Sequence, residues 1–263
     1  MTSVGGWLSK ESALLIHETN HAQLDIGVEG AVAEIGVHHG RLFILLALLR
    51  RPGEAALAID LFEHQEFNVD KSGAGDREIL QSNLKRFRID TRRMQIVSRS
   101  SMTVSPSEIL CDVGKVRMFS IDGGHTADIA ENDLRLAERV MSVGGVVFLD
   151  DVFTSIFPGV SEALGRYLLT DGKLVPFAVS PGKTFLTDQQ HATTYRDVLK
   201  NAMKSIYLRD EIFYGKKVAI FRDFEPWNER VQLRIAHSAA YQRVRGARAI
   251  KAIRPILLRV LDR

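Results

Sequence analysis

Cysteine and long apolar runs are scarce in this sequence, and each absence excludes a class of protein. Cys111 is the single cysteine among 263 residues, which leaves neither an intramolecular disulfide nor a cysteine-based zinc site. No apolar run reaches the ~20 residues of a membrane-spanning helix, and residues 1–9 lack the pattern of a secretory signal peptide. We therefore expect a cytoplasmic protein with no transmembrane segment.

Acidic residues are scarce only near the C-terminus. The net charge is +3, but residues 230–263 contain many arginines and one acid, Asp262. The remainder of the chain is acidic, so the charge does not indicate a nucleic-acid enzyme. We predict a basic helical extension at 229–263. It is expected to dock on a partner subunit, which would make the protein a homo-oligomer, and the weaker alternative is contact with a membrane surface.

Residues 1–228 are expected to form one domain, with 1–29 as a helical lead-in. Its predicted strands are 31–35, 55–60, 94–97, 116–121, 146–149, 174–179, 184–186 and 217–221. Its predicted helices are 41–50, 76–87, 127–141, 160–169 and 193–207. Alternating strands and helices favour parallel strands joined by right-handed crossovers. The sequence thus predicts an α/β fold, a doubly wound, mostly parallel Rossmann-like sheet with an antiparallel C-terminal hairpin.

Glycines surround the end of the first predicted strand. The string Glu34–Gly40 (EIGVHHG) leads into a helix, where glycine permits a tight turn and the helix N-terminus offers free N–H donors. Asp60 ends the second strand, where an acid can accept hydrogen bonds from both hydroxyls of a ribose. A structural turn and a helix cap would explain each feature separately. Together they favour an adenosine-type ligand.

Three carboxylates and one imidazole follow the fourth and fifth predicted strands. Asp122 and His125 follow the fourth strand, and Asp150 and Asp151 follow the fifth. Ligands bind at the carboxyl ends of parallel strands, and carboxylates crowded there repel unless a hard cation such as Mg²⁺ lies between them. His125 is then a candidate base for a hydroxyl that the cation acidifies. Each aspartate alone is equally typical of a cap or a turn.

Three strings carry a resemblance to a known family. They are Glu34–Gly40, Ile121–Asp133 (IDGGHTADIAEND) and Gly144–Asp151 (GGVVFLDD). Over residues 7–187 the chain resembles the class I methyltransferase superfamily, and within it the metal-dependent sugar O-methyltransferases of the macrocin and mycinamicin type. That group is in turn similar to the cephalosporin hydroxylase family.

The resemblance implies a site for S-adenosylmethionine and a site for Mg²⁺ or another divalent cation. The residues implied to contact the cofactor are Glu34, Gly36, Val37, Gly40, Asp60, Leu61, Ser100 and Asp122. The implied metal ligands are Asp122, Asp150 and Asp151, and the implied catalytic residues are His125 and Asp122. Relatives often have Gly-Asp-Ser where this chain has Ser98-Arg99-Ser100, so the adenine contacts depart from the family pattern.

The implied activity is methyl transfer to a hydroxyl, of a sugar or a glycosylated small molecule, with Mg²⁺-assisted deprotonation. Glycan and catechol-like acceptors stay open. A nicotinamide-dependent oxidoreductase would share the glycine turn and the strand-end acid. However, this turn lacks the Gly-x-Gly-x-x-Gly spacing, and the chain has no Tyr-x-x-x-Lys pair. The non-enzymatic alternative is a catalytically degenerate scaffold that binds through its basic tail.

Overall fold

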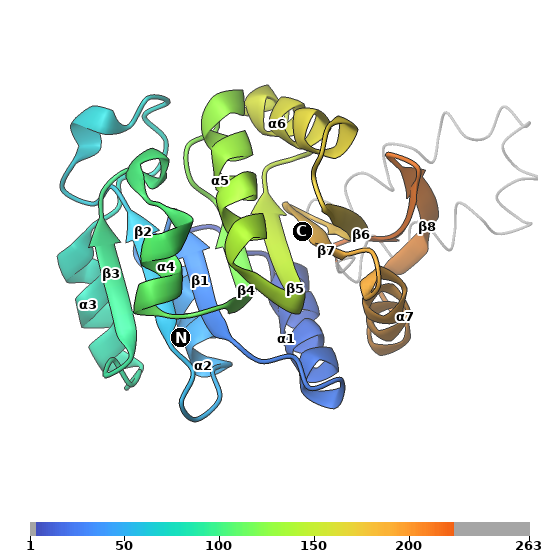
Figure 1. Ribbon diagram of the computed structural model, residues 1–263, viewed down its shortest axis with the longest axis horizontal. Coiled ribbons are helices and arrows are strands. Elements are labelled where there is room, and N and C mark those ends of the chain that lie inside the picture. The colour runs from blue at the N-terminus through green and yellow to red at the C-terminus, as the bar shows by residue number, and fades with distance from the viewer. Residues whose placement is uncertain (1–3, 224–263) are drawn as a thin grey trace, which may run out of the picture. The chain divides into compact units, whose positions relative to one another are not determined.

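A computed structural model describes residues 4–223, which contain one mixed sheet with helices on both of its faces (Figure 1). The strands are β1 Ala31–Ile35, β2 Ala56–Asp60, β3 Met94–Ser98, β4 Val116–Ile121, β5 Met141–Asp150, β6 Leu174–Ser180, β7 Lys183–Asp188, β8 Tyr207–Phe213 and β9 Lys216–Phe221. The α-helices are α1 Lys10–Asp25, α2 Arg41–Leu48, α3 Arg77–Arg86, α4 Pro106–Asp112, α5 Ala127–Val140, α6 Pro158–Leu169 and α7 Ala192–Ala202. Short 3₁₀ turns lie at η1 Gln65–Phe67 and η2 Ser101–Thr103.

The strand order is β3-β2-β1-β4-β5-β7-β6-β9-β8. Strands β1 to β5 are parallel to their neighbours, and β7 joins β5 antiparallel and continues into a hairpin with β6. The order reverses between β1 and β4, which is the point where such sheets bind ligands at their carboxyl edge. The predicted doubly wound α/β sheet with an antiparallel C-terminal hairpin is therefore confirmed.

Both faces of the central strands are covered, because every residue of β1 and β4 is buried. Helix α5 shows how the sequence achieves this. The Thr126 side chain caps its first turn, and Ala130, Leu134 and Ala137 recur at helical spacing and pack into the core beneath the sheet. Figure 1 shows α4 and α5 on one side of the strands and α1 on the other.

The structure differs from the sequence predictions chiefly after residue 140. Met141, predicted as the last residue of helix 127–141, is instead the first residue of β5. The register of β5 against β4 shifts between Met141 and Val146, a stretch that includes Gly144 with a φ of +75°. The predicted helix 193–207 ends at Ala202, and Tyr207–Phe213 is a strand that was not predicted. This strand lies at the sheet edge and is rich in charged residues, so it lacks the apolar alternation on which the prediction depended.

The predicted basic extension at 229–263 lies outside the described residues. Within residues 4–223, none of the helices combines the length and the apolar character that crossing a bilayer would require.

Candidate active site

A pocket of about 640 Å³ opens at the carboxyl edge of the parallel strands. Of the predicted site residues, it is lined by Gly36, Asp60, Leu61, Ser100, Asp122, His125, Asp150 and Asp151. Glu34, Val37 and Gly40 do not line it. The predicted site residues therefore converge, although they fall into an inner and an outer group.

The turn after β1 requires glycine at its first position. Gly36 has a φ of +82°, and a Cβ added there would lie 1.6 Å from the carbonyl oxygen of Asp122. The two loops that follow β1 and β4 therefore touch backbone to backbone. Val37 is 3 % exposed, and Gly40 adopts a left-handed conformation at the start of α2.

Glu34 is a buried acid within β1. Glu34 is 2 % exposed, and its Oε2 has no hydrogen-bond partner among the described residues. Burial raises the pKa of Glu34 well above its usual value, although the nearby Lys183 ammonium opposes that effect. Glu34 thus supports the floor of the pocket and does not reach its surface.

Asp60 connects the first turn to the segment after β2. Its Oδ2 accepts a hydrogen bond of 2.7 Å from the backbone N–H of His38, and its Oδ1 accepts one of 2.9 Å from that of Phe62. A carboxylate oxygen has a second lone pair, so Asp60 can still accept hydrogen bonds from a ligand in the pocket. Ser100 lines the same wall, where its hydroxyl accepts a hydrogen bond from Met102 in η2.

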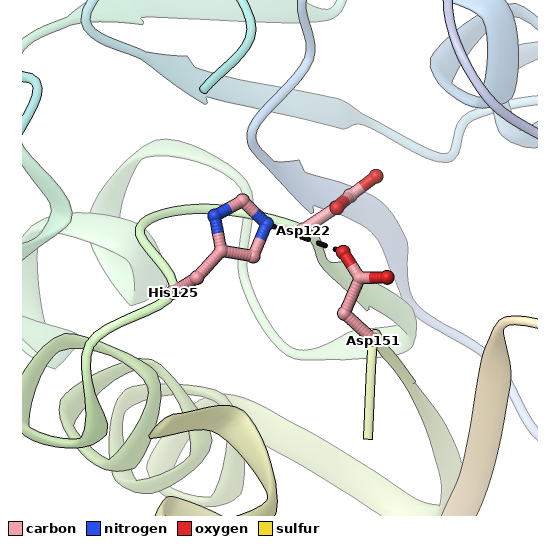
Figure 2. A group of neighbouring side chains, drawn as sticks. All are labelled: Asp122, His125 and Asp151. Atoms are coloured by element: carbon pink, nitrogen blue, oxygen red, sulfur yellow. Dashed lines mark ion pairs between the residues drawn. The ribbon is translucent and has the colours of Figure 1, made fainter. Parts of the chain in front are cut away.

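Asp122, His125 and Asp151 form a close group (Figure 2). One ligand atom of each lies within 4.8 Å of the others, and His125 Nε2 is 3.3 Å from Asp151 Oδ2. Burial, and next the negative charge of Asp150, raise the pKa of Asp122 to about 8. Asp151 has a φ of +58°, an uncommon conformation for a residue other than glycine. Crowded carboxyls and a strained backbone are both typical of a functional site.

Asp150 is not one of these three residues, but it lies beside Asp122 and pairs with a lysine. Lys183, the first residue of β7, is opposite Asp150 in the strand register, and its Nζ donates to Asp150 Oδ2 at 2.6 Å. Burial lowers the pKa of Lys183, but the charges of Asp150 and Asp122 outweigh burial and raise that pKa above its usual value. The donor group in the structure consists of Asp122, His125 and Asp151, whereas the predicted metal ligands were Asp122, Asp150 and Asp151. Lys183 was missed because its importance depends on the pairing of β5 with β7.

His125 is held by Asp70 and Phe157, neither of which was predicted to contact it. Its backbone N–H donates to Asp70 Oδ2 at 2.7 Å, and its Nδ1 lies 2.9 Å from the same oxygen. The ring of Phe157 stacks on the imidazole with 3.8 Å between ring centroids. Burial lowers the pKa of His125, but hydrogen bonds with Asp151 and Asp70 outweigh it, so the pKa is raised.

Comparisons with known proteins bear on the central part of this fold. Residues 33–152, which run from β1 to just beyond β5, match a family model described as a methyltransferase domain. The protein is therefore an enzyme of that class, as its sequence predicts. This domain contains every predicted site residue.

Solved structures share the fold of the methyltransferase domain. One is the O-methyltransferase NovP, with 15 % identity and a TM-score of 0.55 over 67 % of this chain and 80 % of that one. Another is CalS11, a TDP-rhamnose 3'-O-methyltransferase of calicheamicin biosynthesis, with 18 % identity and a TM-score of 0.52 over 68 % of this chain and 81 % of that one. No curated protein sequence matches the chain. At these identities the likeness establishes the fold.

The donor set of the methyltransferase domain fits a divalent cation. Asp122 and Asp151 offer carboxylate oxygens and His125 offers a ring nitrogen. A cation there would also relieve the repulsion that raises the pKa of Asp122. Mg²⁺ prefers oxygen ligands, whereas an imidazole ligand is more typical of transition metals. The residues therefore fit a divalent cation without selecting Mg²⁺.

Proposed function

We propose that this chain is an S-adenosylmethionine-dependent O-methyltransferase that acts on a hydroxyl of a sugar or of a glycosylated small molecule. The observation that carries the proposal is the group formed by Asp122, His125 and Asp151, which opens into the same pocket as Asp60 and Gly36. The methyl donor would occupy the side of the pocket next to β1 and β2. The acceptor would occupy the side next to β4 and β5.

Asp60 and the turn after β1 would bind the donor. The Asp60 carboxylate is fixed by two backbone N–H groups, so it meets a ribose already oriented and little side-chain entropy is lost on binding. Because Gly36 has no side chain, the turn after β1 can lie directly against the backbone of Asp122. S-adenosylmethionine, when bound, supplies an electrophilic methyl, and the chain has to align an acceptor oxygen with it and exclude water.

His125 would remove the proton from the acceptor hydroxyl. Its Nε2 faces the pocket beside Asp122 and Asp151, within reach of a hydroxyl bound there. A divalent cation held by Asp122 and Asp151 would increase the acidity of that hydroxyl and would leave the lone pair of His125 Nε2 for the proton. Lys183 keeps Asp150 compensated, so that the floor of the pocket does not carry an additional unpaired carboxylate.

The acceptor class is supported by the relatives and by the size of the pocket. CalS11 is described as acting on a sugar nucleotide, and NovP is described as an O-methyltransferase. A pocket of about 640 Å³ is within the range of small-molecule sites. The proposal includes a cytoplasmic location, a small-molecule or glycan acceptor rather than nucleic acid, and a possible homo-oligomer.

Calorimetric titration of the purified full chain with S-adenosylmethionine tests the donor, with NAD as the matched control ligand. Binding of S-adenosylmethionine at micromolar concentration without binding of NAD supports the proposal. Binding of NAD alone would instead indicate an oxidoreductase, and binding of neither would indicate a degenerate scaffold.

Transfer of a labelled methyl group to a panel of glycosides and catechols then tests the chemistry. Asp122→Ala and removal of divalent cations by a chelator are each expected to abolish transfer. If transfer to the best acceptor survived both treatments, the metal-assisted mechanism would be wrong.

A further inference from the structure

The segment between β2 and α3, residues 61–76, reaches from the cofactor side of the pocket to His125. At its far end Gly75 lies against Asp60, where an added Cβ would come within 2.5 Å of Asp60 Oδ1. In its middle the Asn68 amide donates to the carbonyl oxygen of Ser72 at 2.8 Å, which folds the segment on itself. The segment therefore has a defined conformation in which Asp70 faces the loop after β4.

Asp70 is bonded to His125 and to its own segment at the same time. Its Oδ2 accepts from the His125 backbone N–H at 2.7 Å and lies 2.9 Å from Nδ1, and its Oδ1 accepts from the Ser72 backbone N–H at 2.9 Å. The side chains of Asp70 and His125 are only 17 % and 11 % exposed. Contact with both the backbone and the ring of His125 fixes where the residue lies and how its ring is rotated.

The remaining surfaces of the imidazole are also defined. Phe157 stacks on it with an interplanar angle of 14°, which prevents the ring from tilting. Nε2 is on the pocket side and lies 3.3 Å from Asp151 Oδ2, a longer contact than the 2.9 Å between Nδ1 and Asp70 Oδ2. In a neutral imidazole one nitrogen carries the proton and the other has the lone pair, and the partner of one nitrogen decides the state of the other.

We propose that Asp70 is the positioning residue of His125, holding the proton on Nδ1 so that the lone pair of Nε2 faces the pocket. The inference rests on the proposed function for its catalytic meaning, because His125 is the base only if the chain methylates a hydroxyl. Nε2 is also the nitrogen that must be unprotonated to bind a cation or to take a proton. Residues 61–76, which border Asp60, thus also orient His125, the proposed base.

Nitrogen NMR of the histidine rings in the metal-free full chain tests this inference without any acceptor. Spectra are recorded with a chelator, well above the pH at which His125 titrates, and its signals are assigned by their loss in His125→Gln. We expect the Nδ1–H form in the wild type and the Nε2–H form in Asp70→Ala. A wild-type His125 in the Nε2–H form would overturn the proposal before any variant is made.

Two matched variants test whether Asp70, and not a neighbouring group, determines the tautomer of His125. Ser72→Ala removes a hydroxyl that lies 3.0 Å from Nδ1 and should leave the Nδ1–H form unchanged. Asp188→Ala removes the carboxylate 2.7 Å from His191 Nδ1 and should alter the signals of His191 but not those of His125. A switch of tautomer in Ser72→Ala, or retention of the Nδ1–H form in Asp70→Ala, would show that Asp70 is not the anchor.

Methyl transfer provides the second readout, on the best acceptor of the panel. Loss of a residue that orients a catalytic group typically costs about 10- to 100-fold, so kcat of Asp70→Ala should fall by this factor while its affinity for S-adenosylmethionine is retained. If the tautomer changes as expected but the wild type transfers no methyl group, the proposed function fails and the role of Asp70 stands. If transfer occurs and Asp70→Ala retains full kcat, the role of Asp70 fails alone.

Discussion

The two ends of β4 carry two charged groups that differ in how fully they are bonded. At its start, the Arg117 side chain is 0 % exposed and donates to both oxygens of Glu54, at 2.8 and 2.9 Å. Its remaining nitrogen donates to Asn20 and Gln23. Just beyond its end, Asp122 has a raised pKa beside Asp150. In the adjacent strand β1, the buried Glu34 Oε2 has no hydrogen-bond partner within residues 4–223.

The difference shows which buried charges maintain the fold and which can serve a ligand. Every nitrogen of the buried Arg117 guanidinium has a hydrogen-bond partner, so none is available to a ligand. Its bonds instead connect α1, β4 and the loop before β2. Carboxyls with raised pKa values retain capacity for a cation or a proton. Substitutions at each end of β4 should therefore have different effects on stability and on ligand binding.

The largest effect is expected at the Arg117 end. Glu54→Ala leaves the Arg117 guanidinium buried without its carboxylate, and breaking a buried pair in this way costs about 3–5 kcal/mol. We expect the free energy of unfolding, measured by urea denaturation, to fall by that amount. Glu29→Ala, at an exposed acid nearby, is the control and should change it little. Equal stabilities of the two variants would contradict the structural role of the pair.

The next effect is expected at the ligand end, on binding rather than stability. Hydrogen bonds to a charged group contribute about 1.5–3 kcal/mol, so Asp60→Ala should weaken S-adenosylmethionine binding about 10- to 100-fold in calorimetry. Asp76→Ala is the matched control, because Asp76 caps α3 through the Ile79 N–H and does not line the pocket. It should reduce stability and leave the affinity unchanged. The reverse pattern would mean that Asp60 does not bind the donor.

Strands that are mostly apolar could be predicted from the sequence with accurate bounds. Ala31–Ile35 and Val116–Ile121 were both predicted residue for residue, because strands buried on both faces contain few polar residues. The exceptions are Glu34, Arg117 and Ser120, which are buried. Helix α4 was missed although Ser105, Pro106 and Glu108 form a capping box with proline at the first turn. At seven residues it is too short to show helical periodicity.

The candidate site could be predicted where it follows strand ends and not where it depends on pairing or loop conformation. A recognisable strand ends at or just before each of Asp60, Asp122 and Asp151. Because the carboxyl ends of parallel strands lie at one edge of the sheet, these residues were predicted to lie close together. Lys183 reaches Asp150 only through the antiparallel pairing of β5 with β7. Asp70 reaches His125 across 55 residues of sequence through an irregular segment, for which no periodic signal exists.

The free energy of unfolding should depend on pH through Asp122, at the carboxyl end of β4. The folded pKa of Asp122 is raised to about 8 from an ordinary 3.8, so the folded protein retains a proton that the unfolded chain loses. Its stabilising contribution is complete below the ordinary pKa and is lost as pH rises toward 8, by up to about 1.4 kcal/mol per pH unit. Burial raises the pKa of Glu34 in the same sense.

Urea denaturation of the metal-free protein between pH 5 and pH 8 measures this dependence, and Asp122→Asn should flatten it. Added divalent cation should restore stability at the alkaline end, because it binds the ionised form. A wild-type stability that is constant over this range would contradict the raised pKa of Asp122.

The smallest effect is expected at a polar group that is fully bonded but exposed. The Ser105 hydroxyl accepts from the Glu108 N–H at 3.3 Å, and the Glu108 carboxylate accepts from the Ser105 N–H at 2.8 Å. Since water can replace these bonds, Ser105→Ala should cost only about 1 kcal/mol of unfolding free energy and leave S-adenosylmethionine binding unchanged. Ser82→Ala, at an exposed position within α3, is the control and should cost nothing. A loss at Ser105 as large as that at Glu54 would mean that burial does not set the difference between the two ends of β4.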